Sequence, residues 1–257
     1  IHKVAATGDS GRITAEDVKE HARSIIAGGA QKPERSESRS LPDFSTWGEI
    51  EREKISATRK KIAGTLAYSW STIPQVTQYE QADITGLEAA RKRYNRSAGD
   101  DAAKLTVTAV ILKITALALK EFPAFNSSFD ADRNEIIYKD YVHISVAVET
   151  DRGLLVPVIR DGDQKSVPQL AEELNDLAER TRNKKVQPAE MVGGNFTISN
   201  LGGIGGTNFS PVLYWPQAGL LGISRAVKTP CYIDGQLVPR LMLPLSLSYD
   251  HRIIDGV

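Results

Sequence analysis

Apolar residues recur at helical spacing in several parts of this chain, and each such part predicts a helix. Over residues 55–70 the spacing indicates a helix with one buried stripe. That stripe consists of Ile55, Ile62, Leu66 and Trp70. Residues 105–119 are apolar nearly all round, so we expect a central, deeply covered helix there. Capping patterns predict two more helices, one opening at Thr85 with Glu88 and one at Ser166 with Gln169.

Residues 142–149 and 241–249 alternate apolar and polar residues at every second position, which is typical of strands. Residues 76–82, 195–199 and 220–225 are further expected strands. Asp234 and Gly235 predict a tight hairpin between two further short strands. Pro244 lies within the last run, and because proline cannot donate to a strand ladder we expect an edge position or a bulge. Helices and strands do not alternate strictly, so the predicted fold class is α+β, with helices on one side of a mixed sheet.

The first 40 residues differ from the rest. Gly8 and Gly11 allow turns, and Thr14 with Asp17 is typical of the start of a short helix. One short helix cannot bury enough surface to be stable alone, so residues 1–22 indicate half of a module. Residues 23–40 are small and polar and predict a flexible linker. A large domain is expected over residues 41–257.

Composition narrows the classes of function. The 257 residues include 32 basic and 32 acidic side chains, so the formal net charge of zero gives no support for nucleic-acid binding. No run of about 18 apolar residues exists, so we expect no membrane span. Cys231 is the one cysteine, which excludes an internal disulfide and fits a reducing compartment such as the cytoplasm. The four histidines are scattered, so no metal site is expected.

The strongest candidate for chemistry is His251, which follows the last predicted strand. A strand end holds an imidazole rigidly, and an imidazole that titrates near neutrality suits a general base for a thiol or hydroxyl. Asp255 and Gly256 follow it. From these residues alone, a hydrogen-bonded histidine in a turn is an equal alternative, and Asp255 fits a turn as well as an orienting role.

A second candidate is Ser199, which precedes the glycine-rich residues 202–206. That loop matches neither a phosphate loop nor a dinucleotide fingerprint, so nucleotide cradling of those kinds is not expected. Close approach to a ligand or to another subunit stays open. Ser199 could donate to a developing oxyanion, although a lone serine is more often structural.

The motifs taken together resemble a known family. Residues 195–206 (NFTISNLGGIGG) and 246–256 (SLSYDHRIIDG) are similar to the dihydrolipoamide acyltransferase component of 2-oxo-acid dehydrogenase complexes. Residues 41–257 resemble its catalytic domain. Residues 1–22 resemble the second half of its peripheral subunit-binding module, with Arg12 in the Gly-Arg-Ile-Thr motif. Residues 76–79, 82–85 and 239–248 are most similar to the acetyltransferase of the pyruvate dehydrogenase complex.

The resemblance implies acetyl transfer between a lipoyl-lysine thioester and coenzyme A. It makes His251 the base for the coenzyme A thiol and Ser199 the donor to the tetrahedral oxyanion. Asp255 matches the motif aspartate, for which we expect an ionic contact with Arg252 or another arginine. Weaker positional matches suggest four coenzyme A contacts: Arg91, Glu149, Leu221 and Ser224.

The implied fold is that of chloramphenicol acetyltransferase, a homotrimer in which His251 and Ser199 of one active site come from different chains. Such trimers build a cubic 24-mer, or a 60-mer in relatives. The implied partners are the dehydrogenase and dihydrolipoamide dehydrogenase components. The lipoyl group sits on a domain absent from this sequence, and the family continues past the Asp-Gly pair, so we expect a fragment. A eukaryotic member would lie in the mitochondrial matrix.

Two alternatives remain at this level. A branched-chain or succinyl acyltransferase would use the same machinery with a different acyl pocket. A non-catalytic core scaffold is the other, and the presence of both His251 and Ser199 argues against it.

Overall fold

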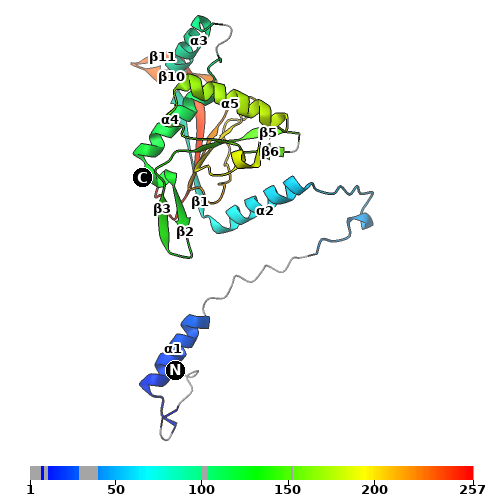
Figure 1. Cartoon of the computed structure of the whole chain (residues 1–257), viewed down its shortest axis with the longest axis vertical. Coiled ribbons are helices and arrows are strands. Elements are labelled where there is room, and N and C mark those ends of the chain that lie inside the picture. The colour runs from blue at the N-terminus through cyan, green and yellow to red at the C-terminus, as the bar shows by residue number, and fades with distance from the viewer. Residues whose placement is uncertain (1–6, 9–10, 29–39, 100–102, 152, 257) are drawn as a thin grey trace. The chain divides into compact units, whose positions relative to one another are not determined.

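The computed structural model describes residues 7–8, 11–28, 40–99, 103–151 and 153–256. The chain forms two compact units, Ile1–Lys54 and Ile55–Val257 (Figure 1). In the first unit, helix α1 (Ala15–Gly28) opens as predicted, because Thr14 N–H donates to Asp17 (2.8 Å) and Asp17 N–H donates back to Thr14 Oγ1 (3.3 Å). Hydrogen bonds from Thr7 and Thr14 hold the pKa of Asp17 well below its usual range.

The α1 helix is longer than predicted, since it runs on to Gly28 through part of the expected linker. The remaining linker residues up to 39 lie outside the described residues. A short 3-10 helix, η2 (Phe44–Thr46), follows, and Asp43 caps it by accepting the N–H of Ser45 (3.1 Å).

The second unit is built on a seven-stranded mixed sheet, which confirms the α+β fold class. Its strands, in spatial order, are β1 (Gln75–Asp83), β11 (Gln236–Asp250), β9 (Gly219–Ile223), β8 (Phe196–Asn200), β4 (Ile144–Val146) and β7 (Val158–Ile159), with β10 (Val227–Ile233) paired to the first half of β11. Strands β4, β8 and β9 run parallel to one another, and the other pairs are antiparallel. Two small hairpins flank the sheet: β2 (Ser127–Asp130) with β3 (Glu135–Tyr138), and β5 (Val148–Thr150) with β6 (Gly153–Leu155).

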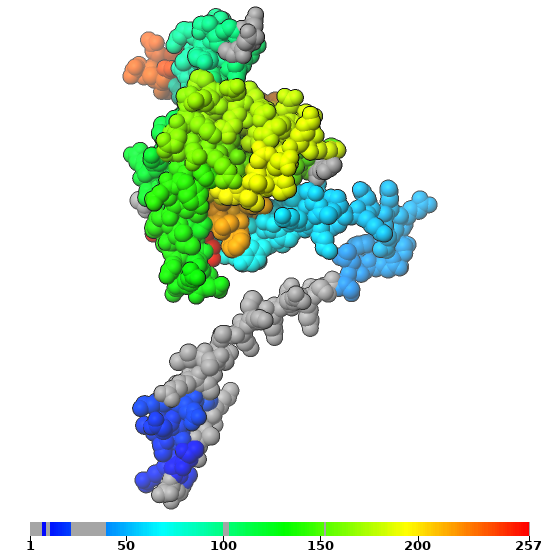
Figure 2. Space-filling model, in the orientation of Figure 1, coloured from blue at the N-terminus to red at the C-terminus, as the bar shows by residue number. Residues whose placement is uncertain are grey.

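Helix α2 (Ala57–Thr72) forms where the periodicity predicts it, with Ser56 as its N-cap. The predicted buried stripe is wrong for the chain by itself. Ser69 is the one buried residue of the helix, whereas Trp70 is 66% exposed. Figure 2 shows α2 in cyan on the surface of the second unit. Periodicity identifies the apolar face of a helix but not what covers it.

Helix α3 (Thr85–Ser97) is also confirmed, but its predicted capping box is wrong. Asp83 accepts the N–H of Thr85 (2.9 Å) instead. Glu88 is bound to Arg91 (2.7 Å), one turn further along the helix, so it does not reach back to the helix start.

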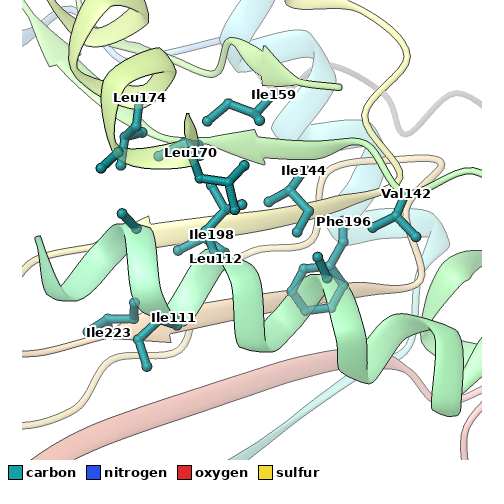
Figure 3. Packing of buried hydrophobic residues seen from close by; sticks show 14 of the residues in the cluster. Ile111, Leu112, Val142, Ile144, Ile159, Leu170, Leu174, Phe196, Ile198 and Ile223 are labelled. Atoms are coloured by element: carbon teal, nitrogen blue, oxygen red, sulfur yellow. The ribbon is translucent and has the colours of Figure 1, made fainter. Parts of the chain in front are cut away.

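Helices α4 (Val107–Glu121) and α5 (Val167–Arg182) cover one face of the sheet and enclose the core (Figures 1 and 3). Buried there are Leu112, Ile144, Leu170, Ile198 and Ile223. The capping box of Ser166 with Gln169 is confirmed at the start of α5. The prediction that α4 is covered all round is wrong for this chain, because Leu117 is 52% exposed. Two short 3-10 helices, η3 (Pro123–Asn126) and η4 (Pro188–Met191), complete the unit.

Pro244 does not mark an edge strand, because β11 is paired on both sides. On one side β9 ends opposite Leu245 and β10 begins opposite Met242. Pro244 falls in that gap, where its carbonyl accepts the N–H of Ser224 (3.1 Å). The backbone N and C=O of one strand residue point to the same neighbouring strand. The nitrogen of Pro244, which carries no hydrogen, therefore faces the gap between β9 and β10. A break between two partners therefore accommodates the proline in a central strand.

Within the described ranges, no helix has the length and apolar character needed to cross a bilayer. The same ranges hold no group of three or more histidine, cysteine, aspartate or glutamate side chains arranged to bind a metal ion.

Candidate active site

His251 lies directly after the last residue of β11, at the start of a turn. Its backbone N–H donates to the carbonyl of Pro74 (3.1 Å), which precedes β1. The side chain is 42% exposed, and its ring centroid lies 5.9 Å from that of Tyr249. An accessible imidazole at a strand end is the arrangement that the sequence predicts for a general base.

Asp255 is 93% exposed, and its carboxylate lies 3.9 Å from Nδ1 of His251. Of the predicted partners of Asp255, Arg252 is wrong, and a contact with another arginine stays a prediction. Arg252 turns back onto the carboxylate of Asp250 at 2.6 Å, and its guanidinium packs over the ring of Phe129 at 4.5 Å. The physical reason is burial: Asp250 is only 2% exposed, and a buried carboxylate needs a charged partner far more than an exposed one does.

Ser199 lies near the end of β8 and is half-buried. Phe196 and Ile198 belong to the core beneath the helices, so the alternation of the strand turns Ser199 to the opposite face of the sheet. Its partner on β9 is Gly222. A Cβ atom on Gly222 would lie 2.7 Å from Cζ of Phe209, so this aromatic ring covers the glycine next to Ser199.

Phe209 was not predicted as a site residue. The available signal was Gly222, because a glycine inside a strand indicates close approach of another group. Nothing in the sequence identified that group as Phe209.

His251 and Ser199 lie far apart within one chain. Ser199 pairs with Gly222, and Gly222 pairs with Ser246 on β11, five residues before His251. A strand rises about 3.4 Å per residue and neighbouring strands are about 4.8 Å apart, so the two residues are separated by roughly 17 Å along the sheet and 10 Å across it. A separation on the order of 20 Å is too large for both side chains to act on one carbonyl group.

Three of the four predicted coenzyme A residues lie at the Ser199 end of the sheet. Ser224 follows β9, and Glu149 lies in β5 beyond the end of β4. These are the carboxyl ends of parallel strands. Arg91 belongs to α3, which follows the end of β1. Since β1 is antiparallel to β11, it ends on the same side. Leu221 instead packs against the core beneath the helices.

The surroundings of these residues differ. Arg91 donates to Glu88 (2.7 and 2.8 Å) and to the carbonyl of Leu105 (2.8 Å), so it ties α3 to the segment before α4. The carboxylate of Glu88 raises the pKa of Arg91. Ser224 is buried, whereas Glu149 is exposed and lines an open cleft with Arg182.

The glycine-rich loop after Ser199 is held in place by two side chains. Asn200 donates to Thr108 of α4 (2.7 Å) and accepts the N–H of Gly202 (2.7 Å). Arg225 donates to the carbonyls of Gly202 and Gly203, each at 3.1 Å. Ile204 projects from this anchored loop and is 68% exposed. The loop is therefore fixed and accessible, which suits contact with a ligand or a second chain.

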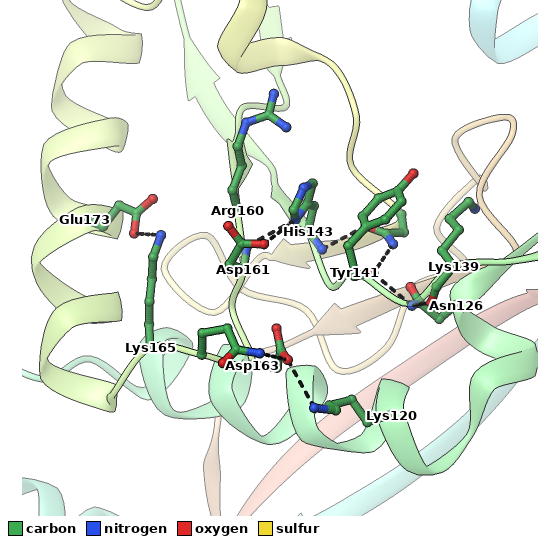
Figure 4. A network of polar contacts seen from close by, with 12 residues as sticks. Lys120, Asn126, Lys139, Tyr141, His143, Arg160, Asp161, Asp163, Lys165 and Glu173 are labelled. Carbon is green, nitrogen blue, oxygen red and sulfur yellow. Dashed lines mark hydrogen bonds and ion pairs between the residues drawn. The ribbon is translucent and has the colours of Figure 1, made fainter.

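His143 has structural contacts. Its Nδ1 accepts the N–H of Asp161 (3.0 Å), and its own N–H donates to Asn195 (2.8 Å) (Figure 4). Lys139, which the sequence did not single out, donates to the carbonyl of Ser127 (3.0 Å) and the hydroxyl of Ser128 (2.6 Å). Burial lowers the pKa of Lys139 to about 8.

Comparison with known proteins gives consistent results. The family model described as 2-oxoacid dehydrogenases acyltransferase (catalytic domain) matches residues 48–257. The dihydrolipoyllysine-residue acetyltransferase component of pyruvate dehydrogenase complex from Pseudomonas aeruginosa is 46% identical over 100% of this chain and 48% of its own length. The same component from Bacillus subtilis is 40% identical over 100% of this chain and 59% of its own length. The chain thus spans about half the length of the curated relatives it matches.

Two solved structures are also similar. One, from Azotobacter vinelandii, is a dihydrolipoamide acetyltransferase studied for the role of one serine, one histidine and one asparagine in its catalytic mechanism. It is 49% identical, with a TM-score of 0.81 over 84% of this chain and 89% of that one. The other is the cubic core of the pyruvate dehydrogenase multienzyme complex, 50% identical, with a TM-score of 0.81 and the same coverage.

Proposed function

Because the chain belongs to the acyltransferase family of the 2-oxoacid dehydrogenases, we propose that it transfers an acetyl group between dihydrolipoyl-lysine and coenzyme A. The observation that carries this proposal is the accessible imidazole of His251 at the end of β11. It is supported by the A. vinelandii protein, whose serine, histidine and asparagine have the same spacing as Ser199, His251 and Asp255 here. An aspartate thus stands at the position of the asparagine.

The proposed reaction begins at the coenzyme A thiol, which is mostly protonated at neutral pH and is a poor nucleophile in that form. His251 takes the thiol proton, and the thiolate attacks the carbonyl carbon of the acetyl thioester. Ser199 donates a hydrogen bond to the oxyanion of the tetrahedral intermediate. When the intermediate collapses, the bond to the lipoyl sulfur breaks, and the imidazolium returns the proton to that sulfur.

Asp255 has a lesser part in this scheme. Its carboxylate is exposed to solvent, and exposed charge pairs contribute little. We propose that its carboxylate, 3.9 Å from Nδ1 of His251, helps to hold the site and is not a proton relay.

We further propose that each active site joins two chains, with His251 from one and Ser199 from its neighbour. The separation on the order of 20 Å within one chain supports this arrangement. Closed rings of identical chains supply such shared sites, and a homotrimer is the simplest ring that fits the family. The apolar face of α2 is available for contact with the neighbouring chain, because most of this helix is not buried. The helix also lies near the proposed site, since Pro74, which follows it, accepts the backbone N–H of His251. The similar cubic core supports assembly of these trimers into a larger 24-mer core.

For residues 1–22 we propose a role in binding the dehydrogenase and dihydrolipoamide dehydrogenase components. The capped start of α1 and Arg12 in the Gly-Arg-Ile-Thr motif support this assignment. The lipoyl group would reach the site on a domain outside this sequence. A reducing compartment, the bacterial cytoplasm or a mitochondrial matrix, fits the lone cysteine.

The test of the acetyl assignment is an assay with dihydrolipoamide and three acyl donors: acetyl-, isobutyryl- and succinyl-coenzyme A. We expect the highest kcat/KM with acetyl-coenzyme A, because the ring of Phe209 beside Ser199 limits the space for a larger group. A faster reaction with a bulkier donor would reassign the acyl group. No reaction with any donor in an assembled particle would favour the scaffold alternative.

A further inference from the structure

Besides the bond from His251 N–H to Pro74, the turn that carries His251 is held by Asp250. The carbonyl of Asp250 accepts the N–H groups of Ile253 and Ile254, each at 3.1 Å. Its own N–H donates to the carbonyl of Ala218 (2.9 Å), which continues the pairing of β11 with the segment before β9. The backbone position of His251 therefore depends on how firmly Asp250 is fixed.

The carboxylate of Asp250 is fixed in turn by Arg252. Oδ1 accepts the backbone N–H (3.0 Å) and Nε (2.9 Å) of Arg252, and Oδ2 accepts Nη2 at 2.6 Å. Asp250 is only 2% exposed, so its carboxylate has little access to water. The two-pronged pairing with Arg252 offsets the cost of burying that charge.

Arg252 also fixes the turn to another part of the unit. Its guanidinium packs over the ring of Phe129 at 4.5 Å, within cation–π distance. Phe129 belongs to β2, in a hairpin that is separate from the main sheet and lies beside the C-terminal end in Figure 1. The pair of Asp250 and Arg252 thus connects the end of β11 to this hairpin.

The imidazole itself has few contacts that could orient it. Its ring is near Tyr249, and Asp255 faces it from the solvent at 3.9 Å. We propose that Arg252, acting through Asp250 and Phe129, is the positioning residue for His251. This inference rests on the proposed role of His251 as the base. The charge pair that orients the histidine is then formed by Asp250 and Arg252, and Asp255 is not part of it.

The expected effect follows from how steeply catalysis depends on geometry. A shift of about 1 Å in a catalytic group can cost on the order of 10²-fold in rate. Without Arg252, the buried carboxylate of Asp250 loses its partner and the turn loses its contact with Phe129. We expect this displacement to lower kcat and to leave the KM for coenzyme A unchanged, because three of the four predicted coenzyme A residues lie at the other end of the sheet.

The experiment compares Arg252→Ala, Arg252→Lys and Phe129→Leu with the unaltered protein, all in the assembled particle. A matched control is Arg180→Ala, which removes the bonds from Nη1 of this α5 arginine to both carboxylate oxygens of Glu190 in η4 (2.8 and 2.9 Å), away from β11. Steady-state kcat and KM, thermal unfolding and particle mass are measured for each. We expect Arg252→Ala to lower kcat by about 10²-fold, Arg252→Lys to restore part of it, and Phe129→Leu to have a smaller effect with assembly intact.

The inference is overturned if Arg252→Lys and Phe129→Leu assemble and have the kcat of the Arg180→Ala control, whether or not Arg252→Ala folds. Parallel measurement of His251→Ala separates this failure from that of the proposed function. Normal turnover in His251→Ala would contradict the role of His251 as the base. Loss of turnover in His251→Ala, together with normal turnover in the Arg252 and Phe129 variants, would contradict only the positioning role of Arg252.

Discussion

Gly222 should not tolerate even a methyl group, because of the ring that lies on it. In Gly222→Ala the new Cβ would meet Cζ of Phe209 at 2.7 Å, Cε1 of that ring at 2.9 Å and Cβ of Ser246 at 3.2 Å. Ser246 belongs to the central strand β11 and cannot yield, so the ring must move away from Ser199. Overpacking of this kind costs about 1–3 kcal/mol.

The assay combines urea unfolding at a fixed protein concentration with acetyl-transfer kinetics. We expect a free energy of unfolding lower by about 1–3 kcal/mol, and partial recovery when Phe209→Leu is added to Gly222→Ala. Gly86→Ala in α3 serves as the control, since no atom lies within 4 Å of its added Cβ and alanine favours the helix. Equal stability of Gly222→Ala and the unaltered protein would refute the packing of Phe209 on Gly222.

Two further predictions concern the same unit. Phe209→Ala should raise kcat/KM for isobutyryl-coenzyme A relative to acetyl-coenzyme A, because it removes the apolar wall beside Ser199; an unchanged ratio would show that the acyl group lies elsewhere. Lys139, whose pKa is lowered to about 8 by burial, should make stability depend on alkaline pH (Figure 4). Below pH 8 the lysine is charged in both states and the cost of burial is present in full. Between pH 8 and the ordinary value of 10.5 the folded state loses the proton first, so stability rises with pH. Relative to Lys139→Met, the unaltered protein should gain on the order of 1 kcal/mol over this window in urea unfolding, since solvent still screens a half-buried lysine, and a constant difference would contradict the burial of the charge.

The sequence allowed prediction of elements whose signals are local. The capping box of Ser166 with Gln169 and the strand ending at His251 depend on residues a few positions apart, and both are confirmed. The location of His251 at an accessible strand end could be predicted for the same reason. The pairing of remote motifs in one site came from the family resemblance and not from periodicity.

Other features depend on contacts that a linear pattern does not contain. The apolar face of α2 was recognised, but its exposure was not, because exposure depends on contacts outside the helix. The partner of Arg252 was mistaken because the choice between Asp250 and Asp255 is decided by burial, and burial is set by the whole sheet. Pro244 was expected at an edge or a bulge, and the edge is wrong, because the break between β9 and β10 is visible only once both strands are paired with β11.

The claim that one active site joins two chains can be tested by mixing two inactive variants. His251→Ala lacks the base, and Ser199→Ala lacks a donor whose loss typically costs on the order of 10²–10³ in rate. The two variants are unfolded together in equal amounts, refolded, and assayed as assembled particles, beside each variant refolded alone. If each site takes its serine and its histidine from neighbouring chains of a ring, about one site in four joins an intact Ser199 to an intact His251.

The account therefore predicts recovery of about one quarter of the activity of the unaltered protein in the mixture, with almost none in either variant alone. If both residues of a site came from the same chain, every chain would carry one defect, and no mixture could exceed the average of its parts. A mixture with only that average activity, in particles shown by mass to contain both variants, would contradict the shared site.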